Sequence, residues 1–378
     1  MKILNVNLTL GLKFGGGTAE RTFQLSKHLA NMPGIQCTVL TIRTEDLDED
    51  RISSIYPAKL IALPYLWKRF YIPRSGFSLI KKLVKDTDIV HIMGHWTILN
   101  ILVYSAIRKY KKPYVVCPAG SLPLYGRSLL IKNIYNKIIG NRIIRNANGW
   151  IAVTKSELPH YQNYGILASL VKIIPNGIDI NNFPEVDVDK YKLKYNLPNA
   201  PFILFMGRLN PIKGPDLLLE AFIKIQEHLL NYHLIFVGPD GGLLNELIQR
   251  SKESGINNRI HFLGFLDGMD KVAAYKSSTL LVVPSRQEAM SIVAIESGIC
   301  GTPVLITDQC GFDEIKKIDP NWVVPASVSG LANGMMEVLK NIDSLNMKKN
   351  KIVNFVYDNY TWQSLIPTYI NFYKNINK

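Results

Sequence analysis

Short apolar runs alternate along this chain with longer stretches in which apolar residues recur at helical spacing. Runs of strand length are predicted near residues 2–8, 36–42, 88–93, 113–117, 149–153 and 171–174, then from 202 and at 233–237, 260–262, 280–283 and 303–306. Alternation of this kind is typical of parallel sheets wrapped by helices. The pattern therefore predicts an α/β protein with two doubly wound, Rossmann-like domains.

The length and the polar segments suggest where these domains divide. A chain of 378 residues that is 47% hydrophobic is long enough for two cores. Residues 180–201 are rich in Asn, Asp and Pro, which predicts the region of the joint. We expect one domain over residues 1–180, a second over 181–360, and an amphipathic terminal helix over 361–378, kinked at Pro367.

Composition favours a large enzyme that stays in the cytoplasm. No run approaches the roughly 18 apolar residues of a membrane span, and the first residues resemble a strand rather than a signal peptide. The cysteines lie far apart without metal-ligand spacing, so we expect buried free thiols, no disulfide and no zinc. They are Cys37, Cys117, Cys300 and Cys310.

The net charge of +14 is concentrated in the first half of the chain. Residues 1–189 hold 24 Lys and Arg against 13 Asp and Glu, and the remainder holds 20 against 17. Segment 64–74, followed by Lys81, Lys82 and Lys85, mixes aromatic residues with cations. This segment forms either a basic face over buried aromatics or a surface for an anionic membrane. No nucleic-acid-binding motif accompanies it, so no nucleic-acid partner is expected.

Two glutamates flank an apolar run that follows a predicted strand. Glu288 comes just after the strand that ends at Pro284, and Glu296 lies eight residues later. If a helix opens with the amides of Ala289, Met290 and Ser291, Glu296 lies two turns along on nearly the face of Glu288. Carboxylates suit sugar hydroxyls and free amides suit phosphate. A pair at this spacing also occurs in ordinary amphipathic helices.

A basic loop and a glycine loop each follow a strand. Gly207 and Arg208 end an apolar run, and Lys213 follows five residues after the arginine. Two cations on one such loop can clamp a diphosphate, although a solvated basic loop is the simpler alternative. Gly15, Gly16 and Gly17 follow the first strand, where backbone amides can approach a phosphate or a hydroxyl. Their tight spacing does not fit a dinucleotide fingerprint.

In this order, together with Pro175-Asn176-Gly177-Ile178-Asp179 and Cys300-Gly301-Thr302-Pro303-Val304, these motifs resemble the retaining GT-B glycosyltransferases of family 4. The resemblance covers most of the chain. It implies two Rossmann-like domains facing across a cleft, with an acceptor-binding first domain, a donor-binding second domain and a terminal helix that crosses back to the first.

The resemblance also implies roles for individual residues. Arg208 and Lys213 would neutralise the leaving diphosphate, Glu288 would contact the donor sugar, and Glu296 would hold the ribose. Further donor contacts would come from Gly16, Gly17, Gly207, Ala289, Met290, Ser291 and Ile292, and Asn176 and Glu157 are weaker candidates at the cleft edge. The implied donor is a nucleotide-sugar, with UDP its commonest nucleotide, and neither metal nor cofactor is required.

Two positions depart from the family pattern. The family often has two histidines at spacing two after a strand, whereas here Met93 follows His91, and His95 stands in a different register. Ala119 occupies a position where His or Arg is common. His91 fits a hydrogen-bonded residue at the strand end as well as a direct role.

Other functions share this architecture. A nucleotide-sugar 2-epimerase binds the same donors and needs no separate acceptor, and a nucleotide-sugar sensor or basic membrane-associated scaffold needs no catalysis. The ordered charged motifs favour the transferase. The basic, aromatic first domain suggests a glycan or lipid-linked acceptor in surface polysaccharide synthesis, with peripheral contact to the inner membrane face.

Overall fold

The computed structural model describes residues 1–124 and 128–376 and divides into two compact units. The first unit contains Met1–Gly177 and the segment that begins at Trp362, and the second contains Ile178–Thr361. Segment 180–201, predicted as the joint, lies inside the second unit. There α8 (Val188–Lys194) packs against α11 (Gly268–Ser277), and Asp270 accepts hydrogen bonds from Lys194 and Tyr195.

The first unit is built on a seven-stranded parallel sheet in the order β3-β2-β1-β6-β7-β8-β9. Its strands are β1 (Lys2–Val6), β2 (Gln36–Ile42), β3 (Lys59–Leu63), β6 (Ile89–Met93), β7 (Tyr114–Cys117), β8 (Gly149–Ala152) and β9 (Val171–Ile173). Every residue of β6 and β7 is buried, as expected for central strands covered on both faces.

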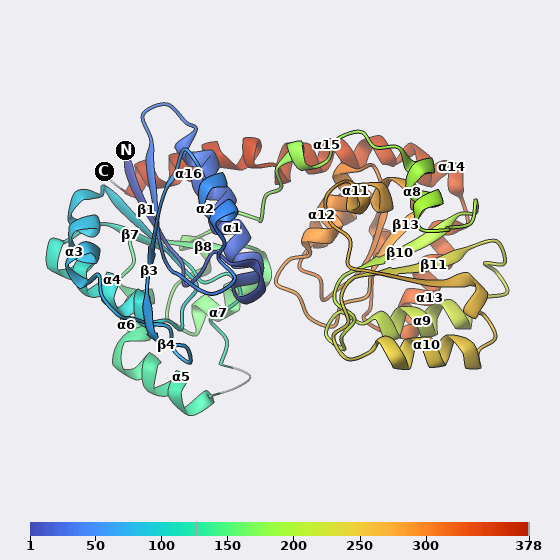
Figure 1. Ribbon diagram of the computed structural model, residues 1–378, viewed down its shortest axis with the longest axis horizontal. Coiled ribbons are helices and arrows are strands. Elements are labelled where there is room, and N and C mark those ends of the chain that lie inside the picture. The colour runs from blue at the N-terminus through green and yellow to red at the C-terminus, as the bar shows by residue number, and fades with distance from the viewer. Residues whose placement is uncertain (125–127, 377–378) are drawn as a thin grey trace. The chain divides into compact units, whose positions relative to one another are not determined.

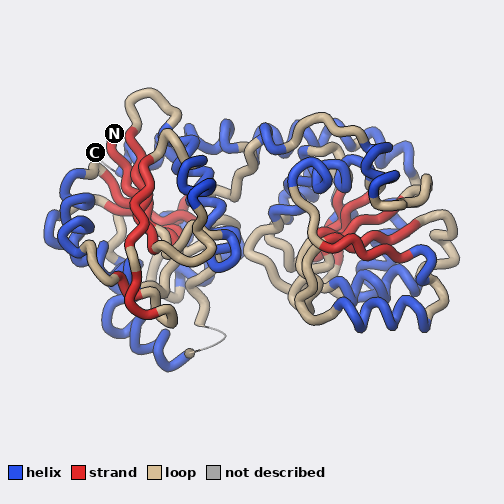
Figure 2. The backbone as a smooth tube through the Cα atoms, viewed as in Figure 1, coloured by secondary structure: helices blue, strands red, loops and turns tan. Residues whose placement is uncertain are grey.

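Helices cover both faces of this sheet (Figures 1 and 2). They are α1 (Leu12–Ala30), α2 (Glu49–Ser54), α3 (Phe77–Asp86), α4 (Ile98–Tyr110), α5 (Leu129–Tyr135), the π-helical η1 (Asn136–Gly140), α6 (Asn141–Arg145), α7 (Leu158–Gln162) and α16 (Trp362–Ile376). A small antiparallel hairpin, β4 (Tyr65–Trp67) with β5 (Ile72–Pro73), follows β3. The sequence pattern predicted neither β3 nor this hairpin, because edge strands have few fully buried residues.

The terminal helix α16 belongs to the first unit and packs against α1. The buried guanidinium of Arg21 on α1 donates hydrogen bonds to the Tyr369 hydroxyl at 2.5 Å and to the Ile174 carbonyl at 2.8 Å. Tyr373 adds a hydrogen bond to the His91 ring at 2.7 Å. Polar contacts therefore anchor α16 on the elements that it covers, and the helix continues through Pro367.

The second unit has a six-stranded parallel sheet in the order β12-β11-β10-β13-β14-β15. The strands are β10 (Phe202–Met206), β11 (His233–Val237), β12 (Ile260–Gly264), β13 (Leu280–Val283), β14 (Val304–Thr307) and β15 (Val323–Val324). All but the two-residue β15 were predicted. The α/β prediction with two parallel sheets is thereby confirmed.

Helices also cover both faces of the second sheet, with α9, α10 and α13 on one face and α11 and α12 on the other (Figure 1). Besides α8 and α11, the α-helices of this unit are α9 (Pro215–Lys224), α10 (Leu244–Glu253), α12 (Ile292–Ile299), α13 (Val328–Leu339), α14 (Ile342–Met347) and α15 (Lys349–Tyr360). Within the described ranges, no helix has the length and apolar character needed to span a bilayer. The four cysteines are free thiols, and only Cys300 is partly exposed.

Candidate functional site

The order of the second sheet reverses between β10 and β13. The chain proceeds from β10 to β11 and β12 on one side, then returns to β13 beside β10. In open α/β sheets, ligands bind beyond the carboxyl ends of the strands at such a switch point. Here the two flanking loops are residues 207–214 and 284–291, which carry Arg208, Lys213 and Glu288.

An ion pair connects the two loops. The ammonium of Lys213 lies 2.7 Å from the carboxylate of Glu288, whose side chain is only 8% exposed. The Ser285 hydroxyl donates a second hydrogen bond to the same oxygen at 2.5 Å. Burial of a carboxylate is costly unless a cation and donors compensate for the lost water. Lys213 and Ser285 provide that compensation, and the sequence pattern did not identify Ser285.

A second ion pair strengthens the same connection. Arg286 binds Asp216, at the start of α9, through both guanidinium nitrogens, at 2.9 and 2.5 Å, and donates to the Pro211 carbonyl at 2.6 Å. Paired bonds of this kind fix orientation as well as distance. At Gly214, where φ is +68°, a Cβ atom would stand 2.1 Å from the Pro284 carbonyl oxygen. Only glycine permits so close an approach of the two loops.

Arg208 is exposed, and no carboxylate in the described parts of the chain forms an ion pair with it. Its aliphatic stem runs over Gly241, where a Cβ atom would lie 2.8 Å from the Arg208 Cγ. The loop backbone is fixed because the Asn210 side chain accepts from the Lys213 amide at 3.0 Å. Arg208 thus presents a free cation beside a cation that is already paired.

The start of α12 differs from the sequence prediction. The helix begins at Ile292, with Ser291 as its N-cap, slightly later than predicted, and Glu288 lies on the preceding loop, as predicted. The amides of Glu288 and Ser291 donate to the carbonyls of Gln309 and Cys310, both at 2.9 Å. Because these backbone bonds to the loop after β14 hold residues 288–291 as a loop, α12 begins only at Ile292. The Ser291 amide was predicted to be free for a ligand. It is instead occupied by the Cys310 carbonyl.

The same helix start retains one unsatisfied polar group. The Ser291 hydroxyl is fully buried and finds no hydrogen-bond partner within the described residues. Buried hydroxyls are rarely left without a partner. Ile292 opens the helix and is partly exposed, whereas Ala289 and Met290 lie on the loop before it.

Glu296 interacts with a different element from Glu288. One of its oxygens lies 2.7 Å from the Lys271 ammonium, and the other accepts from the Tyr275 hydroxyl at 2.8 Å. Both partners lie on α11. Burial and the nearby carboxylate raise the pKa of Tyr275 well above its usual value, so the phenol keeps its proton. The two glutamates therefore bind different elements, whereas the sequence pattern placed them on nearly the same face.

In the first unit the sheet order reverses between β1 and β6. The glycine loop follows β1 and lies within the first turns of α1, where Gly16 has φ +51° and ψ −139° and interrupts the helix. Gly16 and Gly17 are exposed, and added Cβ atoms would meet nothing within 4 Å. Asp46 accepts from the Phe14 amide at 3.0 Å and fixes the start of this segment. The glycines therefore present open backbone at the carboxyl edge.

Two candidates of the first unit bind to the elements that hold α16, and one of them, His91, lies in the core. His91 is fully buried in β6, where burial and the Arg21 guanidinium lower its pKa to about 3. Asn176 accepts from Arg21 at 2.7 Å. His91 and Asn176 therefore belong to the network that anchors α16. Helix α16 contributes its tyrosines from about 280 residues further along the chain, a proximity that no local pattern could show.

His95 and Glu157 order two other loops of this edge. His95, 1% exposed on the loop after β6, interacts with the Asn136 side chain at 3.0 Å and lies among the rings of Trp96, Tyr135 and Tyr164. Burial lowers its pKa to about 4. Glu157 accepts from the amides of Gly120 and Val153, both at 2.8 Å.

Ala119 has an uncommon backbone conformation, and Met93 is buried. Ala119 has φ +49° and precedes Gly120, whose amide is bound by Glu157. A left-handed conformation costs a non-glycine residue about 1–2 kcal/mol. Met93 is fully buried at the end of β6. The turn at residue 119 is thus held in a strained form by a buried carboxylate at a position where the sequence departs from the family pattern.

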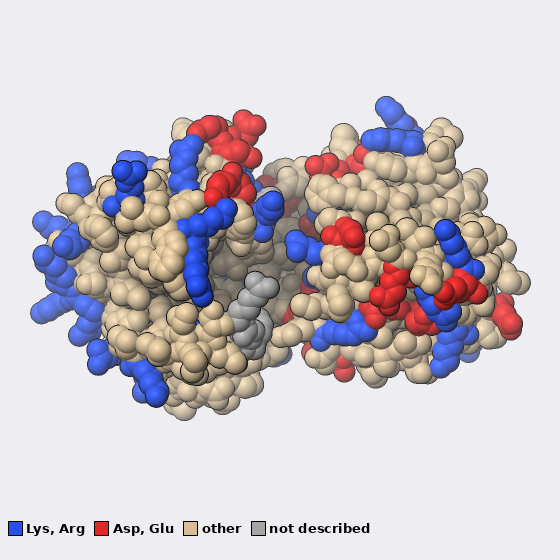
Figure 3. Space-filling model, turned by 60° about the horizontal axis from the view of Figure 1, so that its bottom comes forward, with Lys and Arg blue, Asp and Glu red and all other residues tan. Residues whose placement is uncertain are grey.

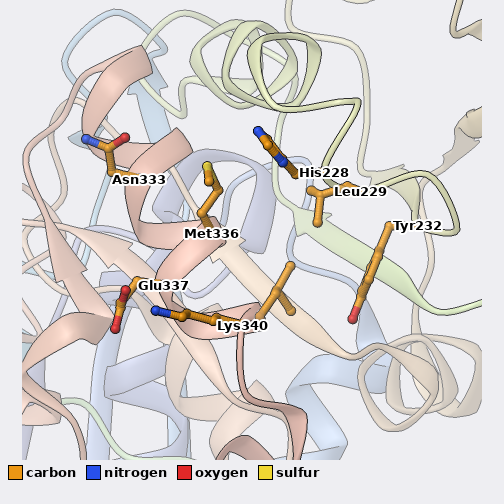
Figure 4. A pocket seen from close by; sticks show the side chains of 8 residues that line it. His228, Leu229, Tyr232, Asn333, Met336, Glu337 and Lys340 are labelled. Atoms are coloured by element: carbon orange, nitrogen blue, oxygen red, sulfur yellow. The ribbon is translucent and has the colours of Figure 1, made fainter.

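A cavity of about 530 Å³ lies elsewhere in the second unit. Figure 4 shows Met336 of α13 and Lys340, which follows that helix, on one side and Leu229 and Tyr232 on the other. None of the charged residues at the β10–β13 edge lines this cavity. It is not part of the candidate site.

Two Rossmann-like units, each with a switch point at the carboxyl edge of its sheet, define the GT-B class. The model described as Glycosyltransferase Family 4 matches residues 15–182, and the model described as Glycosyl transferases group 1 matches residues 187–353. The two matches together cover most of both units. The chain belongs to this family, as the ordered motifs predicted.

Relatives and solved structures agree with this assignment. An uncharacterized glycosyltransferase of Methanocaldococcus jannaschii is 33% identical over 211 residues, and the match spans 54% of each chain. A glycosyltransferase structure from Rickettsia africae has a TM-score of 0.79 at 20% identity and covers 100% of this chain and 98% of its own. Anabaena HepE, solved with UDP and glucose, has a TM-score of 0.76 at 18% identity and covers 99% and 100%. At these identities the structures show the shared fold.

Proposed function

We propose that this protein is a retaining glycosyltransferase that moves a sugar from a UDP-sugar to a glycan or lipid-linked acceptor in surface polysaccharide synthesis. The observation that carries the proposal is the charge arrangement at the β10–β13 edge. There Arg208 is exposed, and the Lys213–Glu288 pair closes at 2.7 Å. Family membership supports sugar transfer, and the structure of HepE with UDP and glucose supports the choice of nucleotide.

The residues of this edge divide the chemistry of transfer between them. Arg208 and Lys213 would bind the diphosphate and neutralise the charge that develops as it leaves. Glu288 accepts hydrogen bonds and would orient the donor sugar while stabilising positive charge at its reacting carbon. The first turn of α12 adds partial positive charge near the phosphates. With two cations supplied by side chains, we expect transfer to proceed without a divalent metal, and treatment with EDTA to leave the rate unchanged.

Glu296 would hold the ribose hydroxyls of the nucleotide. Its carboxylate is fixed by Lys271 and Tyr275, and each carboxylate oxygen can accept more than one hydrogen bond. Glu296→Gln should therefore weaken UDP binding while leaving the Lys213–Glu288 pair in place. Unchanged UDP affinity in this variant would contradict the ribose assignment.

A thermal-shift screen of the purified protein against UDP, GDP, ADP and their sugar conjugates tests the donor site. A ligand at one hundred times its Kd stabilises the native state by about 2.7 kcal/mol, which raises the melting temperature. We expect a selective shift with UDP compounds. No shift with any nucleotide would contradict the donor-site assignment.

Donor consumption then separates the alternative activities. A transferase consumes the nucleotide-sugar in proportion to added acceptor. Formation of a 2-epimer without acceptor would identify an epimerase. Binding without consumption, across a panel of glycan and lipid-linked acceptors, would favour a sensor.

A further inference from the structure

A helical segment of the first unit exposes an unusually apolar face. Helices α5, η1 and α6 follow one another without a break over Leu129–Arg145. The exposed aliphatic side chains are Leu129 (46%), Leu130 (79%), Ile131 (43%), Ile134 (56%) and Ile138 (63%). Leu130, Ile134 and Ile138 recur every four residues, the spacing of neighbours on one side of a helix. Contiguous apolar surface of this kind marks a contact with another surface.

The opposite side of this segment is firmly packed. The Tyr135 hydroxyl donates to the His95 carbonyl at 2.6 Å, and the Asn136 side chain lies between the His95 ring and the Tyr164 hydroxyl. Ile143 and Ile144 are buried in the core. The segment therefore lies against the first unit by one side only. Its exposed aliphatic face is a surface of the folded unit, located beside the loop that follows β6.

The stretch of sequence that contains the segment carries charge of a single sign. Residues 89–156 contain ten Lys and Arg and no Asp or Glu. Lys137 and Arg142, next to the aliphatic residues, are exposed. In the view from below, Lys and Arg border the tan lower part of this unit, and its Asp and Glu gather elsewhere (Figure 3). Helices with an apolar face and flanking cations bind in the headgroup region of anionic bilayers, with the apolar residues about 5–10 Å deep.

We propose that the α5–η1 face, formed by Leu130, Ile134 and Ile138 and flanked by Lys137 and Arg142, is a docking surface for an anionic lipid bilayer. The basic aromatic segment 64–74 also exposes Leu66 and Trp67, but it has no helical apolar face. It folds into the β4–β5 hairpin, where Lys68 pairs with Glu45 at 3.0 Å. The proposal goes beyond the proposed reaction, because transfer from a nucleotide-sugar does not by itself require a membrane. It places the loop that carries His95 next to the lipid surface.

Co-sedimentation of the full chain with vesicles tests the aliphatic part of this surface. The test variant combines Leu130→Asn, Ile134→Asn and Ile138→Asn. The control combines Leu193→Asn, Leu230→Asn and Met347→Asn, at positions of the second unit that are 79%, 72% and 70% exposed. On phosphatidylcholine vesicles that contain phosphatidylglycerol, we expect wild type and control to bind at least tenfold more tightly than the test variant.

The cationic part is tested separately, so that the proposal does not depend on one variant. Lys137→Gln with Arg142→Gln should weaken binding to phosphatidylglycerol vesicles severalfold, because each cation near the surface contributes to attraction. Lys252→Gln with Lys351→Gln, at exposed positions of the second unit, should leave binding unchanged. Raising the salt concentration should weaken wild-type binding more than that of the Lys137 and Arg142 variant.

Three results would overturn the proposal. They are absence of wild-type binding to anionic vesicles, equal binding by the triple variant and its control, and a wild-type dimer that the triple variant converts to a monomer in light scattering. The last result would assign the face to a second copy of the chain. UDP thermal shifts measured on the same samples show whether the donor site is intact. Failure of membrane binding is thus distinguished from failure of the proposed reaction.

Discussion

The carboxyl edges of the two sheets are built from different chemistry. At the β10–β13 edge, half-exposed loops are joined by ion pairs, Lys213 with Glu288 and Arg286 with Asp216. At the β1–β6 edge, His91 and His95 are buried in hydrogen-bonded and aromatic surroundings that lower their pKa values to about 3 and 4. These histidines are therefore uncharged at neutral pH. The β10–β13 edge thus carries charged side chains, both paired and unpaired, whereas the histidines of the β1–β6 edge are neutral.

This difference follows from where each edge places its polar groups. Charge can be maintained on loops that water still reaches, where a partner and a few donors offset the remaining desolvation. A fully buried imidazole loses its proton because the charged form cannot be solvated. On the proposed function, we therefore expect the anionic donor at the edge of the second unit and uncharged groups of the acceptor at the edge of the first. The following predictions test that division.

Loss of the Glu288 carboxylate should have the largest effect. Glu288→Gln keeps the size of the side chain but removes the negative charge that pairs with Lys213. The positive charge that develops on the sugar as the diphosphate leaves then loses its stabilising partner. We expect kcat to fall on the order of 10²–10³-fold, as when a single electrostatic group is removed from an active site. Steady-state kinetics with a UDP-sugar measure this. The matched control, Glu246→Gln at an exposed position of α10, should retain full activity. A Glu288→Gln enzyme within twofold of wild type would place catalytic charge elsewhere.

Loss of Arg208 should lower the rate without loss of stability. The guanidinium is exposed and forms no ion pair with a described carboxylate, so its removal leaves no buried group unsatisfied. We expect Arg208→Ala to reduce kcat by about 10²-fold and to leave the melting temperature unchanged, with Lys252→Ala as the control. Unchanged turnover would contradict the diphosphate clamp.

Acid should destabilise the first unit through its buried histidines. Their folded pKa values lie below the unfolded value of about 6.5, so the unfolded chain binds more protons, and stability falls as the pH drops below 6.5. At pH 5.5 each histidine costs about 1.4 kcal/mol relative to neutral pH. His91→Gln should therefore reduce the drop in melting temperature between pH 7.5 and 5.5, whereas the exposed His228→Gln should not. An unaltered pH dependence in His91→Gln would show that His91 binds protons equally in the folded and unfolded states.

Loss of the ion pair between the two loops should have a small effect on both stability and activity. The Arg286 and Asp216 side chains are 39% and 32% exposed, so their ion pair contributes about 1 kcal/mol or less to folding. A double-mutant cycle with Arg286→Ala and Asp216→Ala should give a coupling in that range from chemical denaturation. The KM for the nucleotide-sugar should rise severalfold in both single variants, because the loops lose their mutual orientation. Additive effects on KM would indicate that each residue acts alone.

Local patterns predicted most of the strands and the loops that follow them. The buried strands were recognisable as apolar runs, and Arg208, Lys213 and Glu288 were placed correctly on loops at a carboxyl edge. The pairing of Lys213 with Glu288 was not predicted, because it depends on β13 returning to lie beside β10 after two intervening strands. The ion pair between Arg286 and Asp216 was not predicted for the same reason, since it also joins the loops after β13 and β10.

Other features were left open or missed where distant segments meet. Of the two alternatives for His91, the structure shows the hydrogen-bonded residue at the strand end, and its partner is Tyr373 of α16. The helix carrying Glu296 was expected to begin before Ser291, but hydrogen bonds to residues 309 and 310 hold that segment as a loop. Helical spacing alone gives no information about a competing backbone partner. Lys271 and Tyr275 were missed for a similar reason, since they bind Glu296 from another helix.

The close contact at Gly214 has a consequence for engineering. A side chain at Gly214 would collide with the Pro284 carbonyl, and Arg286 also binds the Pro211 carbonyl. The loops after β10 and β13 therefore fit each other and have to be exchanged together. A chimaera that imports residues 207–216 from a relative must import residues 284–288 with them. Exchange of both loops together is the smallest graft that keeps these contacts intact.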